Sequence, residues 1–142
     1  MKNVEVNGKS WKPTKSWFIR GKTFSVEVHL HTVEPAIFDG FLDDRGESRW
    51  CVYAYIFPAH PLFSKFESDQ IYQDATEVMP FHCGCTYLKR SPDVIKVGCD
   101  YNHLHDDFYT HLEGPEDSLR VFNDANELFD WLEEREPKGE AA

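Results

Sequence analysis

The sequence predicts an α+β fold: a mainly antiparallel sheet with a central hairpin at about residues 81–101 and one C-terminal helix at about residues 124–135. Apolar and polar residues alternate over residues 23–33, and two further alternating runs flank a turn at residues 89–93. Apolar residues then recur at helical spacing after residue 124. Strands followed by one packed terminal helix are typical of this class.

Length and composition indicate one globular domain at residues 1–136, followed by a frayed tail at residues 137–142. A chain of 142 residues with 41% apolar residues can bury a core. No apolar run is long enough to cross a bilayer, and the N-terminus shows no secretory signal. We therefore expect a cytoplasmic protein with reduced cysteines and no membrane partner.

The charge of the chain is strongly unbalanced. A net charge of −10 argues against nucleic acid as a partner, because phosphate binding needs a basic surface. Residues 113–136 are acidic, which is either ordinary solvated surface or a face that meets a basic partner or mimics DNA. Basic residues gather instead in the first segment: Lys2, Lys9, Lys12, Lys15, Arg20 and Lys22.

Four segments before and after the hairpin complete the predicted fold. Residues 23–33 form a strand that places His29 and His31 on its wet face, where a third ligand would be needed for a metal. Residues 49–57 are apolar on both faces and predict a central, doubly covered strand. A short helix is one option for residues 67–79, and residues 119–122 predict a last strand. A capping box of Asp124 and Glu127 then starts the helix.

The predicted hairpin joins strands at residues 81–88 and 94–101. Period two places the three cysteines Cys83, Cys85 and Cys99 on the core face. A turn centred near Ser91 would make two glycines face each other and leave a floor where a ligand can approach. The predicted pairs on this polar face are His82 with Asp100, Gly84 with Gly98, and Thr86 with Lys96.

The loop after the second strand carries His103 and Asp106, which would join His82 and Asp100 if it curls back. Such a group can act as general acid and base, ligate a divalent metal or hydrogen-bond a polar ligand. Alternatively, these His and Asp side chains have a purely structural role and hold the loop in place by hydrogen bonds. The cysteine spacing differs from that of zinc ribbons and knuckles, so no metal and no cofactor are assigned.

Four short motifs in order resemble a family of small, mostly phage- and prophage-encoded proteins of unsettled function. The motifs are W-C-x-Y from Trp50, H-P-L-F-x-K from His60, H-x-G-x-T-Y from His82, and G-x-D-x-x-H-x-x-D from Gly98, so the resemblance covers about residues 50–107. It implies an accessory or counter-defence role in the host cytoplasm. The chain departs from the family pattern at Cys83, Cys85, Cys99 and His105.

We expect a non-enzymatic binding protein that captures a small polar, nucleotide-like ligand or blocks a host defence protein. The alternatives are a small hydrolase using His82, Asp100, His103 and Asp106, with or without a metal, and an acidic mimic of DNA. An exposed strand edge would also allow a homodimer. The predicted ligand-binding residues are His60, His82, Gly84, Thr86, Gly98, Asp100 and His103.

Overall fold

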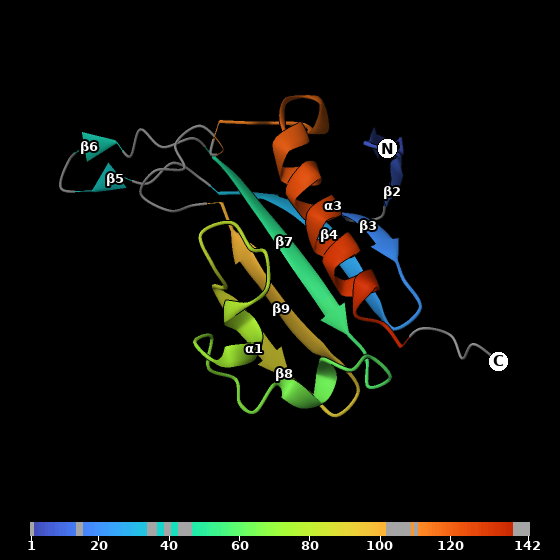
Figure 1. Cartoon of the computed structure of the whole chain (residues 1–142). Helices are drawn as coiled ribbons and strands as arrows, with labels where there is room; N and C mark the ends of the chain where they lie inside the picture. Colours follow the sequence, from blue (N-terminus) through green and yellow to red (C-terminus); the bar gives the residue numbers. More distant parts are fainter. Residues whose placement is uncertain are drawn as a thin grey trace.

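The computed structural model describes residues 2–13, 16–33, 37–38, 41–42, 47–101, 109 and 111–137. An antiparallel seven-stranded sheet runs through the molecule in the order β1-β2-β3-β4-β7-β9-β8, and the long helix α3 crosses one of its faces (Figure 1). The predicted α+β class is confirmed. The strands of this sheet are β1 Val4–Val6, β2 Lys9–Pro13, β3 Trp17–Arg20, β4 Phe24–Thr32, β7 Ser48–Ile56, β8 Tyr87–Arg90 and β9 Ile95–Asp100.

The remaining described elements are short, except for α3. A two-stranded hairpin, β5 with β6, precedes β7 in the chain. In the described ranges, no helix has both the length and the apolar character needed to cross a membrane. The bounds are β5 Ile37–Phe38, β6 Phe41–Leu42, the helical turns η1 Phe63–Lys65 and η2 Pro115–Asp117, and the helices α1 Asp74–Glu77 and α3 Leu119–Glu134.

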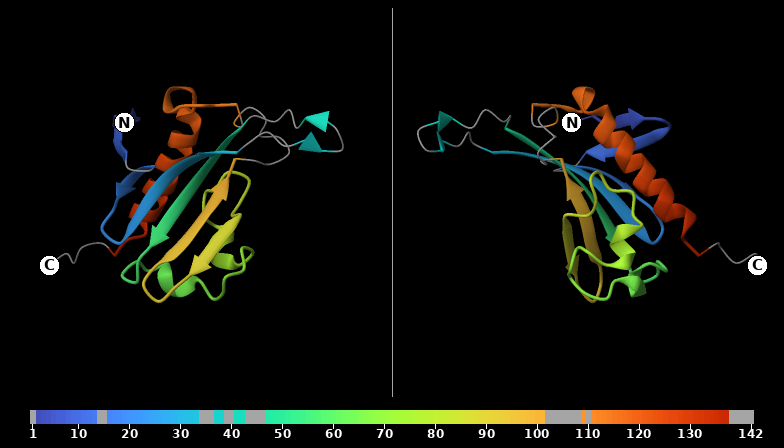
Figure 2. Two further views of the ribbon diagram at one scale, coloured as in Figure 1. Left: turned by 180° about the vertical axis from the view of Figure 1, so that it is seen from behind. Right: turned by 60° about the vertical axis from the view of Figure 1, so that its left-hand side comes forward.

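The centre of the sheet is the pair β4 and β7, whose register aligns Val26 with Ala54 and Val28 with Val52. The predicted alternation in β4 is confirmed, because its apolar residues Phe24, Val26 and Val28 are fully buried. The prediction that β7 is covered on both sides is wrong. Both α1 and α3 lie on one face of the sheet, and no described helix lies on the other (Figure 2). We call this second side the open face.

The N-terminal segment forms a hairpin that the sequence also signals. Asn7 and Gly8 join β1 to β2, and both have positive φ, 47° and 84°. An Asn-Gly pair between two short strands favours a two-residue hairpin turn, because both residues tolerate the left-handed region. The hairpin brings Trp11 into the core, where its side chain is fully buried.

Helix α3 begins at Leu119, five residues before the predicted start at Asp124, so the predicted strand at residues 119–122 and the capping box are both wrong. Val121 and Phe122 favour strands by propensity, but they belong to the buried stripe of the helix. The stripe follows helical spacing through Val121, Phe122, Ala125, Leu128, Phe129 and Leu132. Tertiary burial therefore overrides local propensity in the first turn.

Asn126 fastens the N-terminal hairpin to α3 inside the core. Its Oδ1 accepts a hydrogen bond from the indole Nε1 of Trp11 at 2.9 Å, and its Nδ2 donates to the carbonyl of Val6 at 2.8 Å. Only 5% of Asn126 is exposed. A buried amide is stable in a core when its donors and acceptors are paired in this way.

The variant Asn126→Ala should lower the free energy of unfolding by about 2 kcal/mol, because it leaves the buried Trp11 N–H without its acceptor. Urea unfolding followed by tryptophan fluorescence measures the change. Asn123→Ala is the matched control, since Asn123 accepts a surface hydrogen bond from Asn7. We expect the control to change stability by less than about 0.5 kcal/mol. Equal losses in the two variants would contradict the role of Asn126.

Candidate functional site

The hairpin of β8 and β9 has a different register from the predicted one. Tyr87 pairs with Gly98 and Lys89 pairs with Lys96, so Gly84 does not face Gly98 and Thr86 does not face Lys96. The two strands are joined by a tight turn in which Ser91 N donates to the carbonyl of Val94 at 3.0 Å. The predicted floor of two opposed glycines is therefore wrong.

Residues 82–84 form a turn and do not extend β8. Cys83 and Gly84 have φ of 55° and 89°, in the left-handed region that a strand cannot use. Cys83 is exposed, so its predicted place on the core face is wrong, whereas Cys85 and Cys99 are buried as predicted. Gly84 thus serves the turn and not a ligand-binding floor.

The absence of a side chain at Gly98 leaves space on the open face, but the ring of Tyr53 fills it. A Cβ atom at this position would lie 2.4 Å from Cδ1 of Tyr53 and 2.4 Å from the carbonyl oxygen of Val52. The Tyr53 ring lies against the bare backbone of Gly98 and meets the Tyr87 ring edge-on at 5.5 Å between centroids. The glycine therefore permits an aromatic pair on the open face.

His82 packs on aromatic rings at one end of β9. Its ring stacks on Tyr101 with centroids 4.3 Å apart and an interplanar angle of 12°, and it meets Tyr109 edge-on. Tyr101 is fully buried and donates its hydroxyl to Asp124 of α3 at 2.6 Å. Alternation along the chain places Asp100 on the other face of the sheet from Tyr101. His82 therefore does not occupy the predicted position directly opposite Asp100.

Thr86 and Asp100 are linked through the backbone of β9. The Thr86 hydroxyl accepts a hydrogen bond from the Asp100 amide at 3.1 Å, and the Thr86 amide donates to the Gly98 carbonyl at 2.9 Å. These bonds continue the pairing of the hairpin beyond the end of β8. The predicted residues His103 and Asp106 lie outside the described residues.

His60 lies at the opposite end of the sheet from His82. It is buried, its Nε2 donates to the carbonyl of Leu132 at 2.9 Å, and its Nδ1 accepts from the amide of Leu62 at 3.0 Å. Its ring also meets Phe24 edge-on. Both nitrogens are therefore engaged in holding the end of α3 against the corner after β7, and the structure does not bring His60 to the other predicted ligand-binding residues.

The open face carries a cluster of tyrosines around one lysine. The ammonium of Lys96 lies 4.2 Å from the ring centroid of Tyr53 and 5.4 Å from those of Tyr55 and Tyr87. Burial is the first cause that raises the pKa values of Tyr53 and Tyr55, so both stay neutral at physiological pH. The sequence carries a signal for this cluster, because tyrosines stand at alternate positions of β7.

Strand pairing arranges the open face in rows that run across the strands. Among the described strand residues, five basic side chains stand on this face against three acidic ones, although the whole chain carries a net charge of −10. The basic residues are Lys12, Arg20, Arg49, Lys89 and Lys96, and the acidic residues are Glu5, Glu27 and Asp100. One row holds Phe18, Glu27, Tyr53, Gly98 and Tyr87, and the next holds Arg20, Ser25, Tyr55, Lys96 and Lys89.

His29 and His31 lie on the open face of β4, as predicted, with ring centroids 5.5 Å apart. Desolvation lowers the pKa of His31, and the nearby His29 and Arg49 lower it further. Among the described residues, no group of three or more His, Cys, Asp or Glu side chains is placed to hold a metal. The third ligand that this pair would need is therefore not among them.

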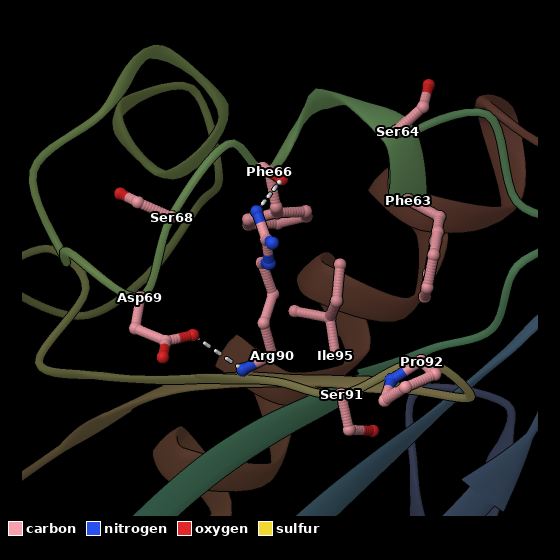
Figure 3. Close-up of a pocket in the computed structure, with 9 residues that line it drawn as sticks. All are labelled: Phe63, Ser64, Phe66, Ser68, Asp69, Arg90, Ser91, Pro92 and Ile95. Atoms are coloured by element: carbon pink, nitrogen blue, oxygen red, sulfur yellow. Dashed lines mark hydrogen bonds between the residues drawn. The ribbon is translucent and has the colours of Figure 1, made fainter.

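A separate pocket of about 600 Å³ lies on the opposite side of β8, next to residues 63–69 (Figure 3). Arg90 crosses it: the guanidinium Nη1 donates to the carbonyl of Phe66 at 2.9 Å, while the Arg90 amide donates to Asp69 Oδ1 at 2.9 Å. Phe66 and Ile95 are buried beneath it. These bonds fasten the loop before α1 to the edge of the sheet, which indicates a structural role.

The acidic surface predicted for the C-terminal segment lies on the outer side of α3. Glu127, Asp130, Glu133 and Glu134 are all exposed, and Asp130 forms an ion pair with Lys9 at 2.8 Å. This arrangement is compatible with solvated surface as well as with a basic partner. The acidic-mimic alternative stays a prediction.

Comparison with known proteins adds no relative. No family model matches the chain, and neither a curated protein nor a solved structure matches it. The resemblance to phage-encoded proteins therefore stays a prediction, and the geometry of the described residues carries the functional assignment.

Gly98→Ala should destabilise the protein by about 2 kcal/mol, because the new methyl group would overlap the Val52 carbonyl and the Tyr53 ring. Gly84→Ala is the matched control. A Cβ at Gly84 would have no neighbour within 4 Å, so only its left-handed backbone should cost stability, about 1 kcal/mol. Chemical denaturation compares the two variants, and a larger loss at Gly84 would contradict the close approach at Gly98.

Thiol titration with Ellman's reagent should label Cys83 rapidly and the other three cysteines only on unfolding. Burial raises the pKa values of Cys51, Cys85 and Cys99, so less reactive thiolate is present at a given pH. In Cys83→Ser the rapid phase should disappear. A rapid phase that survives this substitution would show that a buried thiol opens easily.

Proposed function

We propose that the protein binds a nucleotide-like ligand on the open face of its sheet and releases it unchanged. The observation that carries the proposal is the cluster of Tyr53, Tyr55 and Tyr87 around the ammonium of Lys96. Aromatic rings on a sheet provide stacking surfaces for bases, and a neighbouring cation provides a partner for phosphate.

The charge of this face supports the same ligand class. Lys89 pairs with Lys96 across β8 and β9, and Arg20 stands in the same row beyond Tyr55. Like charges so placed repel one another, and an anion between them would relieve that repulsion. The surface would thus favour a small polyanion even though the chain as a whole repels one.

The placement of His82 and Asp100, the two predicted catalytic residues that the structure describes, favours binding over the hydrolase alternative. His82 packs on Tyr101 and does not stand directly opposite Asp100, so the hairpin does not form the opposed pair predicted for these two residues. Capture of a nucleotide without conversion also fits the accessory or counter-defence role that the phage resemblance implies. Gly98 and Asp100 are the predicted ligand-binding residues that this face includes.

Equilibrium dialysis with radiolabelled ATP and GTP tests the proposal. Tyr55→Ala and Lys96→Ala should each weaken binding of the better nucleotide by about 10-fold or more, because the first removes a stacking surface and the second removes the central cation. Chromatography of the ligand after denaturing the complex should recover the intact triphosphate. Recovery of hydrolysed nucleotide from wild type, but not from His82→Ala, would support the hydrolase instead.

The matched controls replace the same residue types elsewhere. Tyr72 is 79% exposed and lies just before α1, and Lys65 ends η1, so neither belongs to the open face. Tyr72→Ala and Lys65→Ala should bind like wild type. Failure of wild type to retain either nucleotide at millimolar concentration would disprove the proposed function, as would equal losses in the control variants.

A further inference from the structure

A shallow pocket of about 240 Å³ adjoins the tyrosine cluster on the open face, where β3, β4 and the end of β7 meet. Its aromatic lining residues are Phe18, Tyr55 and Phe57, and Glu27 provides its carboxylate. Pockets for drug-sized ligands span roughly 300–1,000 Å³. A pocket below that range fits a single ring system better than a whole nucleotide.

The Glu27 carboxylate is held in a fixed orientation by two donors. The Ser16 hydroxyl donates to Oε2 at 2.5 Å, and the Tyr55 hydroxyl donates to Oε1 at 2.8 Å. A carboxylate has about four lone-pair sites on its two oxygens, so each oxygen of Glu27 can accept a further hydrogen bond. The half-buried Glu27 therefore presents two oriented acceptors between aromatic walls.

We propose that this pocket receives the base of the bound nucleotide and selects guanine. The inference rests on the nucleotide-binding function proposed above. Guanine carries two adjacent donors, N1–H and the 2-amino group, whose spacing matches the two oxygens of a carboxylate. Charge-assisted hydrogen bonds of this paired kind are among the stronger polar contacts in proteins.

The other common bases do not match Glu27. Adenine and cytosine place a ring-nitrogen acceptor beside their amino group, so one carboxylate oxygen would face a lone pair. Uracil and thymine have a single N–H between two carbonyl oxygens, which would repel the carboxylate. An unpaired or repelled buried acceptor costs more than a hydrogen bond contributes. The pocket should therefore discriminate by base as well as by shape.

A basic side chain of a protein partner is the other occupant that aromatic walls and a carboxylate could attract. The surrounding cations argue against it. The Arg20 guanidinium already lies 5.8 Å from the Phe57 ring centroid, and Lys96 lies 5.4 Å from that of Tyr55. Lys12 pairs with Phe18 on the same face. These cations would repel a basic side chain and attract the phosphates of a nucleotide.

Isothermal titration calorimetry with GTP, ITP and ATP tests the inference on the wild-type protein. ITP keeps the N1–H of guanine but lacks its 2-amino group. We expect GTP to bind about 10-fold or more tightly than ATP, with ITP between them, because each lost donor leaves one Glu27 oxygen unpaired. This series needs no variant, so it does not depend on any substitution folding.

Glu27→Gln should remove the preference for GTP, because the amide replaces one acceptor with a donor. Its affinity for ATP should stay the same or rise. Phe18→Ala should weaken GTP and ATP by similar factors, since a stacking wall does not distinguish bases. The control for charge is Glu67→Gln, on an exposed loop residue outside the pocket, which should retain the wild-type preference.

The outcomes separate the two proposals. If GTP and ATP bind equally, or if Glu27→Gln keeps the GTP preference, the guanine assignment is wrong while nucleotide binding stands. If none of the three nucleotides binds, the proposed function itself is wrong. If N-acetylarginine amide displaces GTP from wild type but not from Glu27→Gln, the pocket takes a basic side chain and the guanine assignment is overturned.

Discussion

Phe122 is the residue through which the helix holds the sheet. Its ring meets three tryptophans edge-on, with centroids 5.9 Å from Trp11, 5.5 Å from Trp17 and 6.1 Å from Trp50. These tryptophans come from β2, β3 and β7, so one helical side chain contacts three strands that are distant from it in sequence. Aromatic rings bury large apolar areas, and edge-to-face pairs add stability beyond that burial. The packing of Phe122 on these tryptophans determines which face of the sheet is buried.

Because α3 covers only one face of the sheet, alternate residues along each strand have different roles. Each strand that passes beneath α3 gives alternate side chains to the core and the others to the open face. In β7 the core residues are Trp50, Val52, Ala54 and Ile56, and the intervening tyrosines stand on the other side. The open face therefore needs no additional element to support it. Its side chains are positioned by the same backbone that packs the core.

The sequence predicts β4 well because its alternation is regular and its core side is strictly apolar. It predicts β7 as central but doubly covered, since tyrosine and cysteine on its second side resemble core residues. Tyrosine has an apolar body and a polar tip, so it can stand at a half-exposed position that composition alone assigns to the interior. The fold class thus follows from periodicity, whereas the exposed site depends on knowing which face the helix covers.

The hairpin shows how strongly a predicted site depends on the register of its strands. The sequence predicts Gly84 as a strand residue opposite Gly98, but the left-handed φ at Cys83 and Gly84 ends the pairing before that point. Glycine is compatible both with an open floor and with a turn, and only the register distinguishes them. His82 moves with that turn onto Tyr101. The short-range pattern contains the residues but not the pairing that would bring them together.

For a related reason, the net charge of the chain does not predict the charge of the open face. It sums over the whole chain, whereas a ligand meets one surface and is screened from charges more than about 10 Å away at moderate salt. Exposed acidic residues of α3 lie on its outer side, whereas basic side chains outnumber acidic ones on the open face among the described strand residues. The net charge of −10, from which the sequence predicts no nucleic-acid partner, therefore does not describe the local charge of this face. Because strand alternation separates neighbours in sequence onto opposite faces, an acidic chain can present a basic surface without any basic run in its sequence.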